Sequence, residues 1–346
     1  MVATRAATGA AARRETNSAS APLAKGIPAK ARLHVVTGKG GTGKTTAAAA
    51  LALAIAEAGR KVLLVEVESR QALAQLFDIP PMAYREQRLT MVGTGGQVFG
   101  LAIDAEEAML EYLEMFYGLK RAGKGLKRLG AVDFVTTLAP GLRDVLLTGK
   151  VKEAVTRQQP GGAPVYDAVV LDAPPTGRIA RFLDATREVA KLTKFGPISN
   201  QSHGVIKLLH GPRTAVHIVT LLEEMPVQET LDAAAELKSL GFQLGAVIVN
   251  RARPALITAG QVGPDGAVDV EQLAAGLGQA GVAAVHATAL AAEMSSYAER
   301  QHVQEENAAR LDALALPRIE LPDLNPPVEL GELIDLASCF LKSGAA

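Results

Sequence analysis

The chain has 346 residues, of which 48% are hydrophobic, and this is enough to bury the core of one large α/β domain or of two small ones. Lysine plus arginine and aspartate plus glutamate both total 36, so the chain lacks the basic excess of nucleic-acid-binding proteins, and we expect no nucleic-acid partner. The longest apolar run, Ala47 to Ala56, is too short to cross a bilayer, which argues against an integral membrane protein.

The first 32 residues are rich in alanine, serine and threonine and carry six basic residues against one acid, Glu15. They contain no apolar core of the kind that secretory signals have. We therefore predict a disordered N-terminal tail over residues 1–32, because short polar segments bury too little apolar surface to offset the entropy of ordering. An organellar transit peptide is the alternative.

Short β-branched runs alternate with helical patterns from Leu33 onward. In chain order the runs are LHVVT (33–37), KVLLVEV (61–67), VFGLAID (98–104), YDAVVLDA (166–173), AVHIVTLL (215–222), LGAVIVN (244–250) and PRIELP (317–322). Continuous apolar runs of this length predict strands that are buried on both faces. We expect a single α/β domain over residues 33–342, with a mainly parallel, twisted sheet flanked by helices.

Three connections are longer than a simple crossover needs, and two of them carry a prediction. The first predicts a helical insertion over about residues 104–160. Within it, an apolar stripe is followed by a basic stretch: Met109, Leu113, Phe116 and Leu119, then Lys120, Arg121, Lys124, Lys127 and Arg128. The stripe and stretch are either a core face and a solvated face, or a surface for a client protein or an anionic membrane. The second connection, at about 254–284, is glycine-rich without a regular period, and we predict a variable loop.

The segment GKGGTGKTT at residues 38–46 follows an apolar run and opens an alanine-rich helical pattern, which is the context of a phosphate-binding loop. Glycines let the backbone N–H groups face phosphates at a helix N-terminus, where the helix dipole favours negative charge. We expect Lys44 to bridge the β- and γ-phosphates, Thr45 to ligate Mg²⁺ and Thr46 to reach the α-phosphate. The other predicted nucleotide contacts are Gly38, Gly40, Gly41, Thr42 and Gly43.

A second chemical signal is the acid that ends the run YDAVVLD, Asp172. Beside a phosphate loop, a carboxylate at a strand end can hold the Mg²⁺ ion, directly or through water. We therefore predict Thr45 and Asp172 as the metal ligands. The residues that follow, Pro174 to Gly177, predict a stiff turn into a helix, placed to sense the γ-phosphate.

Four segments together resemble the ArsA/GET-pathway family of ATPases, which are SIMIBI-type P-loop NTPases. They are GKGGTGKTT with its additional Lys39, DAPPTGRIARFL (172–183), EEMPVQET (223–230) and VIVN (247–250). The likeness runs from Leu33 to about Leu341. It implies an ATP-hydrolysing dimer, formed either by two copies of this chain or with a paralogous ATPase. It also implies that Lys39 reaches across the dimer to the partner's nucleotide, as a catalytic residue beside Lys44 and Asp172.

The resemblance assigns further residues. The family's switch motif DPAH aligns with ESRQ, so its water-positioning aspartate corresponds to Glu68, whose extra methylene predicts slow hydrolysis. Asn250 matches the family's adenine-contacting asparagine, and the loop around Pro322 and Asp323 would complete the base pocket. The following VNRARP lacks the carboxylate with which related GTPases read guanine, so we expect ATP rather than GTP.

The lone cysteine, Cys339, excludes an intrachain disulfide and fits a reducing, cytoplasmic location. It also leaves no counterpart for the arsenite site or the zinc-sharing CxxC pair of family members. Three functions therefore stay open. The first is an ATP-switched dimer that binds a client protein or a membrane partner, the second is the energising subunit of an anion transporter, and the third is a MinD-like positioning ATPase. The C-terminal sequence has few basic residues, which argues against the third.

Overall fold

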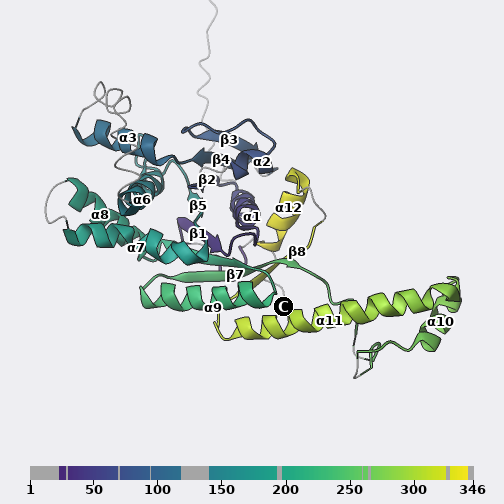
Figure 1. Ribbon diagram of the computed structural model, residues 1–346. Helices are drawn as coiled ribbons and strands as arrows, with labels where there is room; N and C mark the ends of the chain where they lie inside the picture. Colours follow the sequence, from purple (N-terminus) through teal and green to yellow (C-terminus); the bar gives the residue numbers. More distant parts are fainter. Residues whose placement is uncertain are drawn as a thin grey trace, which may run out of the picture.

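The computed structural model of the chain describes residues 23–28, 30–68, 71–93, 95–117, 140–192, 197–258, 260–263, 266–324 and 328–341. Figure 1 shows a central twisted sheet with helices on both of its faces. The described strands are β1 (Leu33–Gly38), β2 (Lys61–Glu66), β3 (Gln87–Met91), β4 (Gln97–Ala102), β5 (Ala168–Asp172), β6 (Thr214–Thr220), β7 (Leu244–Ala252) and β8 (Arg318–Pro322). Across the sheet their order is β3-β4-β2-β5-β1-β6-β7-β8, and every neighbouring pair is parallel except β3 and β4.

Helices cover the sheet in two layers. The described helices are α1 (Lys44–Ala56), α2 (Ala72–Leu76), α3 (Ala105–Tyr117), α6 (Pro140–Thr156), α7 (Thr176–Leu192), α8 (Pro197–Leu209), α9 (Glu224–Ser239), α10 (Val270–Gln279), α11 (Ala287–Asp312) and α12 (Leu330–Cys339), with a short 3-10 turn at Ala284–His286. One layer is formed mainly by α1 and α12. The other contains α3 and α6 to α9, with α11 packed outside α9.

The prediction of strands buried on both faces is confirmed. Adjacent residues of β1 show why: Val36 belongs to the hydrophobic core under α1, whereas Val35 belongs to the core on the opposite face. Side chains alternate along a strand, so a strand with helices on both sides is apolar at every position. The additional strand, β3, was not predicted, because it is an antiparallel edge strand of mixed polar sequence (QRLTM) with none of its residues fully buried.

The boundary of the predicted tail needs correction. Ala24 donates its backbone N–H to the carbonyl oxygen of Phe340 at 2.6 Å, and Ala24, Ile27 and Ala31 are all buried. Apolar side chains within a polar segment were enough to pack residues 23–28 and 30–32 onto the body of the protein. The remainder of the predicted tail, residues 1–22, lies outside the described residues.

The predicted insertion begins and ends with helices, α3 and α6, which pack against each other. The basic stretch from Lys120 to Arg128 lies outside the described residues. Within the described part of the chain, no helix is long and apolar enough to cross a membrane.

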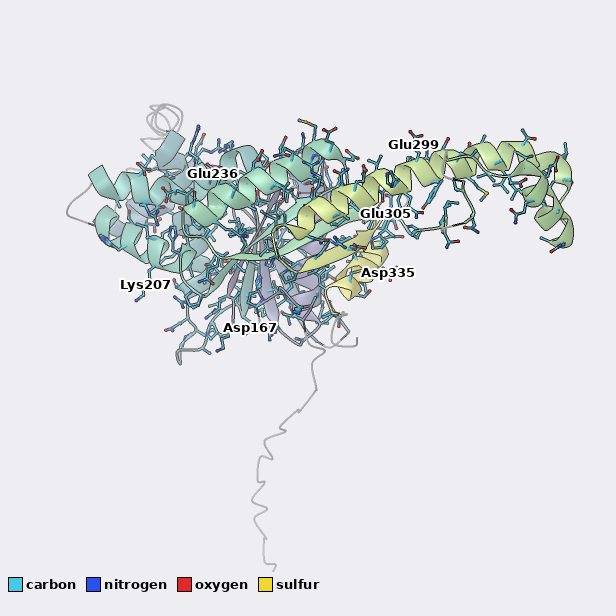
Figure 2. All side chains as sticks on the ribbon, turned by 90° about the horizontal axis from the view of Figure 1, so that it is seen from below. Asp167, Lys207, Glu236, Glu299, Glu305 and Asp335 are labelled. Atoms are coloured by element: carbon cyan, nitrogen blue, oxygen red, sulfur yellow. The ribbon has the colours of Figure 1, made fainter. Side chains whose placement is uncertain are left out.

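Residues 254–284, predicted as a variable loop, instead include the helix α10, which packs beside the N-terminal half of the long helix α11. Figure 1 and Figure 2 show this helical pair projecting from the body as an arm. The glycines Gly276 and Gly278 weaken the helical signal of α10. Asp269 compensates, because its carboxylate caps the helix by accepting hydrogen bonds from the backbone N–H groups of Glu271 and Gln272.

Candidate functional site

The phosphate-loop glycines fall into two groups with different structural reasons. A Cβ atom on Gly38 would lie 2.2 Å from the carbonyl oxygen of Val219, and one on Gly43 would lie 2.2 Å from Nδ2 of Asn250. These two positions exclude side chains because the protein itself fills the space. At Gly40 and Gly41, by contrast, a Cβ would meet no described atom within 4 Å. These two glycines therefore border free space, which is where a bound phosphate needs access to the backbone.

The predicted metal ligands meet at the end of two neighbouring strands. Asp172 ends β5, which pairs with β1, and Thr45 lies in the first turn of α1 directly after the loop. The Thr45 hydroxyl donates a hydrogen bond to Oδ2 of Asp172 at 2.5 Å. Oδ1 of Asp172 is buried and has no hydrogen-bond partner among the described residues. A hard cation such as Mg²⁺ would satisfy this oxygen, so the donor set fits the expected ion.

Burial dominates the electrostatics of Asp172. The residue is 8% exposed, and desolvation raises the pKa of its carboxyl to about 6, with Glu66 and Glu68 adding like-charge repulsion. The hydrogen bond from Thr45 and the charge of Lys44 act in the opposite direction and lower this pKa. A carboxylate in such surroundings gains from a nearby cation, because the cation favours its ionised form.

Two contacts connect the loop to the turn that follows Asp172. The Thr37 hydroxyl donates to the carbonyl oxygen of Pro174 at 2.7 Å. Thr176, at the start of α7, donates its hydroxyl to Oε2 of Glu229 on α9 at 3.1 Å, and Oε1 of the same carboxylate pairs with the Lys39 amine at 2.7 Å. Lys39 is therefore held by its own chain in this structure.

Glu68 lies in the segment after β2, close enough to Asp172 to raise its pKa. It faces Arg178, whose guanidinium lies 3.9 Å from a Glu68 oxygen and 3.6 Å from Oδ1 of Asp144 on α6. Burial raises the pKa of Asp144, and Arg178 partly offsets this effect. Arg178 thus connects the segment after β2, the start of α7 and the insertion.

Two of the three predicted base-binding residues, Asn250 and Asp323, line one pocket, whereas Pro322 does not. Asn250 is buried and donates from Nδ2 to the carbonyl oxygen of Thr42 at 2.9 Å, which places β7 against the phosphate loop. Asp323, one residue beyond Pro322 at the end of β8, pairs with Arg253. A pocket of about 420 Å³ opens beside them, lined by Leu221, Leu222, Glu223, Asn250, Arg251, Arg253, Glu299, Arg300, Val303, Gln304 and Asp323. Its far wall comes from α11.

The structure thus brings together the loop, Thr45, Asp172, Asn250 and, on the pocket rim, Asp323. Sequence reasoning missed two features. Glu229 lies within the quoted segment EEMPVQET, so the signal was present, but nothing in the pattern shows that its carboxylate faces Lys39. The wall supplied by α11 had no usable signal, because its residues come from about 50 positions further along the chain than Asn250.

P-loop nucleoside triphosphatases hold nucleotide phosphate in a glycine loop at the start of a buried helix, beside a carboxylate at a strand end. This chain has the fold and the loop of that class. The profile of the family described as anion-transporting ATPase (ArsA ATPase) matches residues 31–213. The ATPase BagA of Mycobacterium tuberculosis (strain ATCC 25618 / H37Rv) is 55% identical over 317 residues, which cover 90% of this chain and 93% of that protein. The chain therefore belongs to the ArsA ATPase family.

More distant relatives carry two kinds of name. The putative arsenical pump-driving ATPase 2 of Aquifex aeolicus is 25% identical over 253 residues, covering 64% of this chain and 81% of that protein. The ATPase GET3 of Kluyveromyces lactis is 27% identical over 197 residues, covering 55% of each chain. Both names contain ATPase, and only the Aquifex name adds a process, the driving of an arsenical pump.

Proposed function

We propose that the protein binds and hydrolyses Mg²⁺-ATP as a two-subunit switch that couples the nucleotide state to a client protein or a membrane partner. The observation that carries the proposal is the Thr45–Asp172 pair with its unpartnered carboxylate oxygen, next to a glycine loop that borders free space. An acid with a pKa raised to about 6 and an orphaned oxygen is a costly feature in the core of a protein. A cation bound at Asp172 would offset this cost.

Each residue then has a distinct role. Lys44 and the loop N–H groups bind phosphate oxygens, whereas Thr45 and Asp172 hold Mg²⁺, which would neutralise the charge that develops on the transferring phosphate. Glu68 orients the attacking water. The adenine lies between Asn250 and the segment at Pro322 and Asp323; of these residues, Asn250 and Asp323 line the pocket on the β7–β8 side.

Lys39 supplies the argument for a second subunit. The loop of each chain has one lysine, Lys44, in the position that serves its own phosphates, and Lys39 lies at the outer lip with 29% of its side chain exposed. A second, outward lysine can complete the charge stabilisation of a neighbouring site, as arginine fingers do in other phosphoryl-transfer enzymes. The second subunit is either another copy of this chain or a paralogue.

Mixing two inactive variants tests this arrangement. Lys39→Ala keeps a loop that binds ATP, whereas Lys44→Ala loses ATP binding but retains its Lys39. We expect each variant alone to be inactive and the mixture to regain ATP hydrolysis at one site per mixed dimer. Absence of recovery, with subunit exchange shown by differently tagged chains, would contradict a role for Lys39 across the interface.

The proposed coupling of the nucleotide state to a client protein or membrane partner rests on helix α7. This helix starts at Thr176 in the switch turn and packs along α6 of the insertion, where the hydroxyls of Thr186 and Thr148 lie 3.1 Å apart. Movement of the turn would therefore be transmitted to the insertion. Asp172→Asn should trap the ATP state. We expect proteins or lipids that copurify with Asp172→Asn in ATP to be lost from Lys44→Ala, and equal recovery on both would count against nucleotide-controlled binding.

Anion transport is the second candidate, because the matching family is described as anion-transporting ATPases and two Aquifex relatives are named as arsenical pump-driving. In the described part of the chain, no group of three or more histidine, cysteine or acidic residues is placed to hold a metal ion, and Cys339 is the only cysteine. We expect arsenite and antimonite to leave ATP hydrolysis unchanged. A severalfold stimulation would favour the transporter function.

A further inference from the structure

Three segments that are distant in the sequence meet at one carboxylate. Glu229 on α9 pairs through Oε1 with the Lys39 amine of the phosphate loop at 2.7 Å, and accepts through Oε2 the hydroxyl of Thr176 at 3.1 Å. The neighbours of Glu229 along α9 set its direction. Val227 and Thr230 are buried against the body, and this anchoring presents the Glu229 carboxylate at the rim of the site.

The contact with Glu229 competes with the proposed action of Lys39 on the partner's nucleotide. At 2.7 Å its amine makes a charge-assisted hydrogen bond within its own chain, which fixes the side chain there and competes with a phosphate in another subunit. The side chains of Lys39 and Glu229 are 29% and 37% exposed, so the pair lies where an approaching subunit can reach it. Transfer of Lys39 to a partner therefore requires that this ion pair opens.

We propose that Glu229 is a positioning residue that holds Lys39 in its own subunit until the nucleotide-bound partner takes it over. Because Thr176 shares the carboxylate and begins α7, the same group connects Lys39 to the switch turn. A shift of the turn toward a bound γ-phosphate withdraws the Thr176 hydroxyl from Glu229 and loosens its hold on Lys39. This inference rests on the proposed action of Lys39 across the dimer.

The proposal fixes the sign of a measurable effect. An ion pair as exposed as this one is worth a factor of roughly two to five per subunit. Glu229→Gln keeps the size of the side chain and an oxygen that can accept from Thr176, but it removes the charge that holds Lys39. The dimer in Mg²⁺ and a non-hydrolysable ATP analogue should then form more tightly, by roughly fourfold to twenty-fivefold when both subunits carry the substitution.

Analytical ultracentrifugation of the full chain, titrated in concentration, measures this dissociation constant. Glu236→Gln is the matched control, since Glu236 is an exposed carboxylate two turns further along α9 (Figure 2), and we expect it to leave the constant unchanged. The decisive comparison places Glu229→Gln in a Lys39→Ala background. In that background Glu229→Gln should leave the dissociation constant unchanged, because the lysine that it releases is absent. If Glu229 acted instead by repelling the polyphosphate, its replacement would still tighten the dimer.

A second measurement follows the pair directly in the nucleotide-free protein. In NMR spectra of the lysine side-chain amines, we expect a slowly exchanging signal, assigned by its loss in Lys39→Arg, that disappears in Glu229→Gln and stays in Glu236→Gln. An unchanged dissociation constant in Glu229→Gln, or the same change in the Lys39→Ala background, would overturn the inference while leaving the dimer intact. Wild-type protein that stays monomeric with the nucleotide analogue would overturn the action of Lys39 between two copies of this chain, and this inference with it.

Discussion

Replacing Asp172 by asparagine should stabilise the nucleotide-free protein while weakening its response to Mg²⁺. Asp172 is 8% exposed, and one of its carboxyl oxygens has no hydrogen-bond partner among the described residues. The asparagine side chain would keep an oxygen that accepts the Thr45 hydroxyl but would carry no charge into the core. The substitution therefore removes the cost of burying an ionised group and leaves the local packing in place.

The pKa gives the size of this gain. In the folded protein it is raised to about 6 from an ordinary value of 3.8, so the folded state holds its proton more tightly than the unfolded state does. Wild-type stability therefore falls as the pH rises from 3.8 to 6, and the loss is complete above that window. The difference in pKa corresponds to up to about 3 kcal/mol at pH 7.5, and to about half of that at pH 5.

Thermal unfolding without nucleotide measures the effect. For a chain of this length, about 3 kcal/mol should raise the melting temperature of Asp172→Asn by about 4 °C at pH 7.5. The advantage over the wild type should shrink at pH 5, and added Mg²⁺-ATP should stabilise the wild type more than the variant. A variant that is less stable than the wild type, or an advantage that is equal at both pH values, would refute the assignment of Asp172 as a desolvated, cation-seeking acid.

Four further outcomes are expected. Lys44→Ala should lose ATP hydrolysis without unfolding, because its side chain serves phosphate rather than the core; unchanged hydrolysis would contradict the site. ATP should bind more tightly than GTP in a direct titration, since VNRARP has no guanine-reading carboxylate, and equal affinities would reject this. Glu68→Asp should speed turnover severalfold by restoring the shorter acid, so a loss of rate would remove Glu68 from the water-positioning role. The buried ring nitrogens of His34 and His217 lie 3.1 Å apart, and burial lowers the pKa of His34 to about 4 and that of His217 well below its usual value. The unfolded state therefore binds more protons below pH 6.5, so the free energy of unfolding should fall by about 1.4 kcal/mol per pH unit for each imidazole as the pH drops toward 4. Urea unfolding in the Asp172→Asn background measures this, and a free energy that does not change with pH would contradict it.

The amino-acid sequence by itself determined the features that are written in consecutive residues. The run KVLLVEV is short, rich in β-branched residues and apolar at successive central positions, which favours a strand covered on both faces. GKGGTGKTT likewise combines its glycines, its lysine and its helix start within nine residues. Local patterns of this kind predicted the parallel sheet, the phosphate loop and the acid at the end of β5.

Only the tertiary structure decided which distant groups meet. Asn250 reaches the carbonyl of Thr42, and Glu229 reaches Lys39, across about 200 intervening residues. Helix α10 is helical despite two glycines because it packs along α11, and the segment at Ala24 is held by Phe340 at the other end of the chain. Such contacts depend on the order of the strands and on the packing of complete helices. No local pattern of residues encodes them, because their free energy arises only when the rest of the fold is in place.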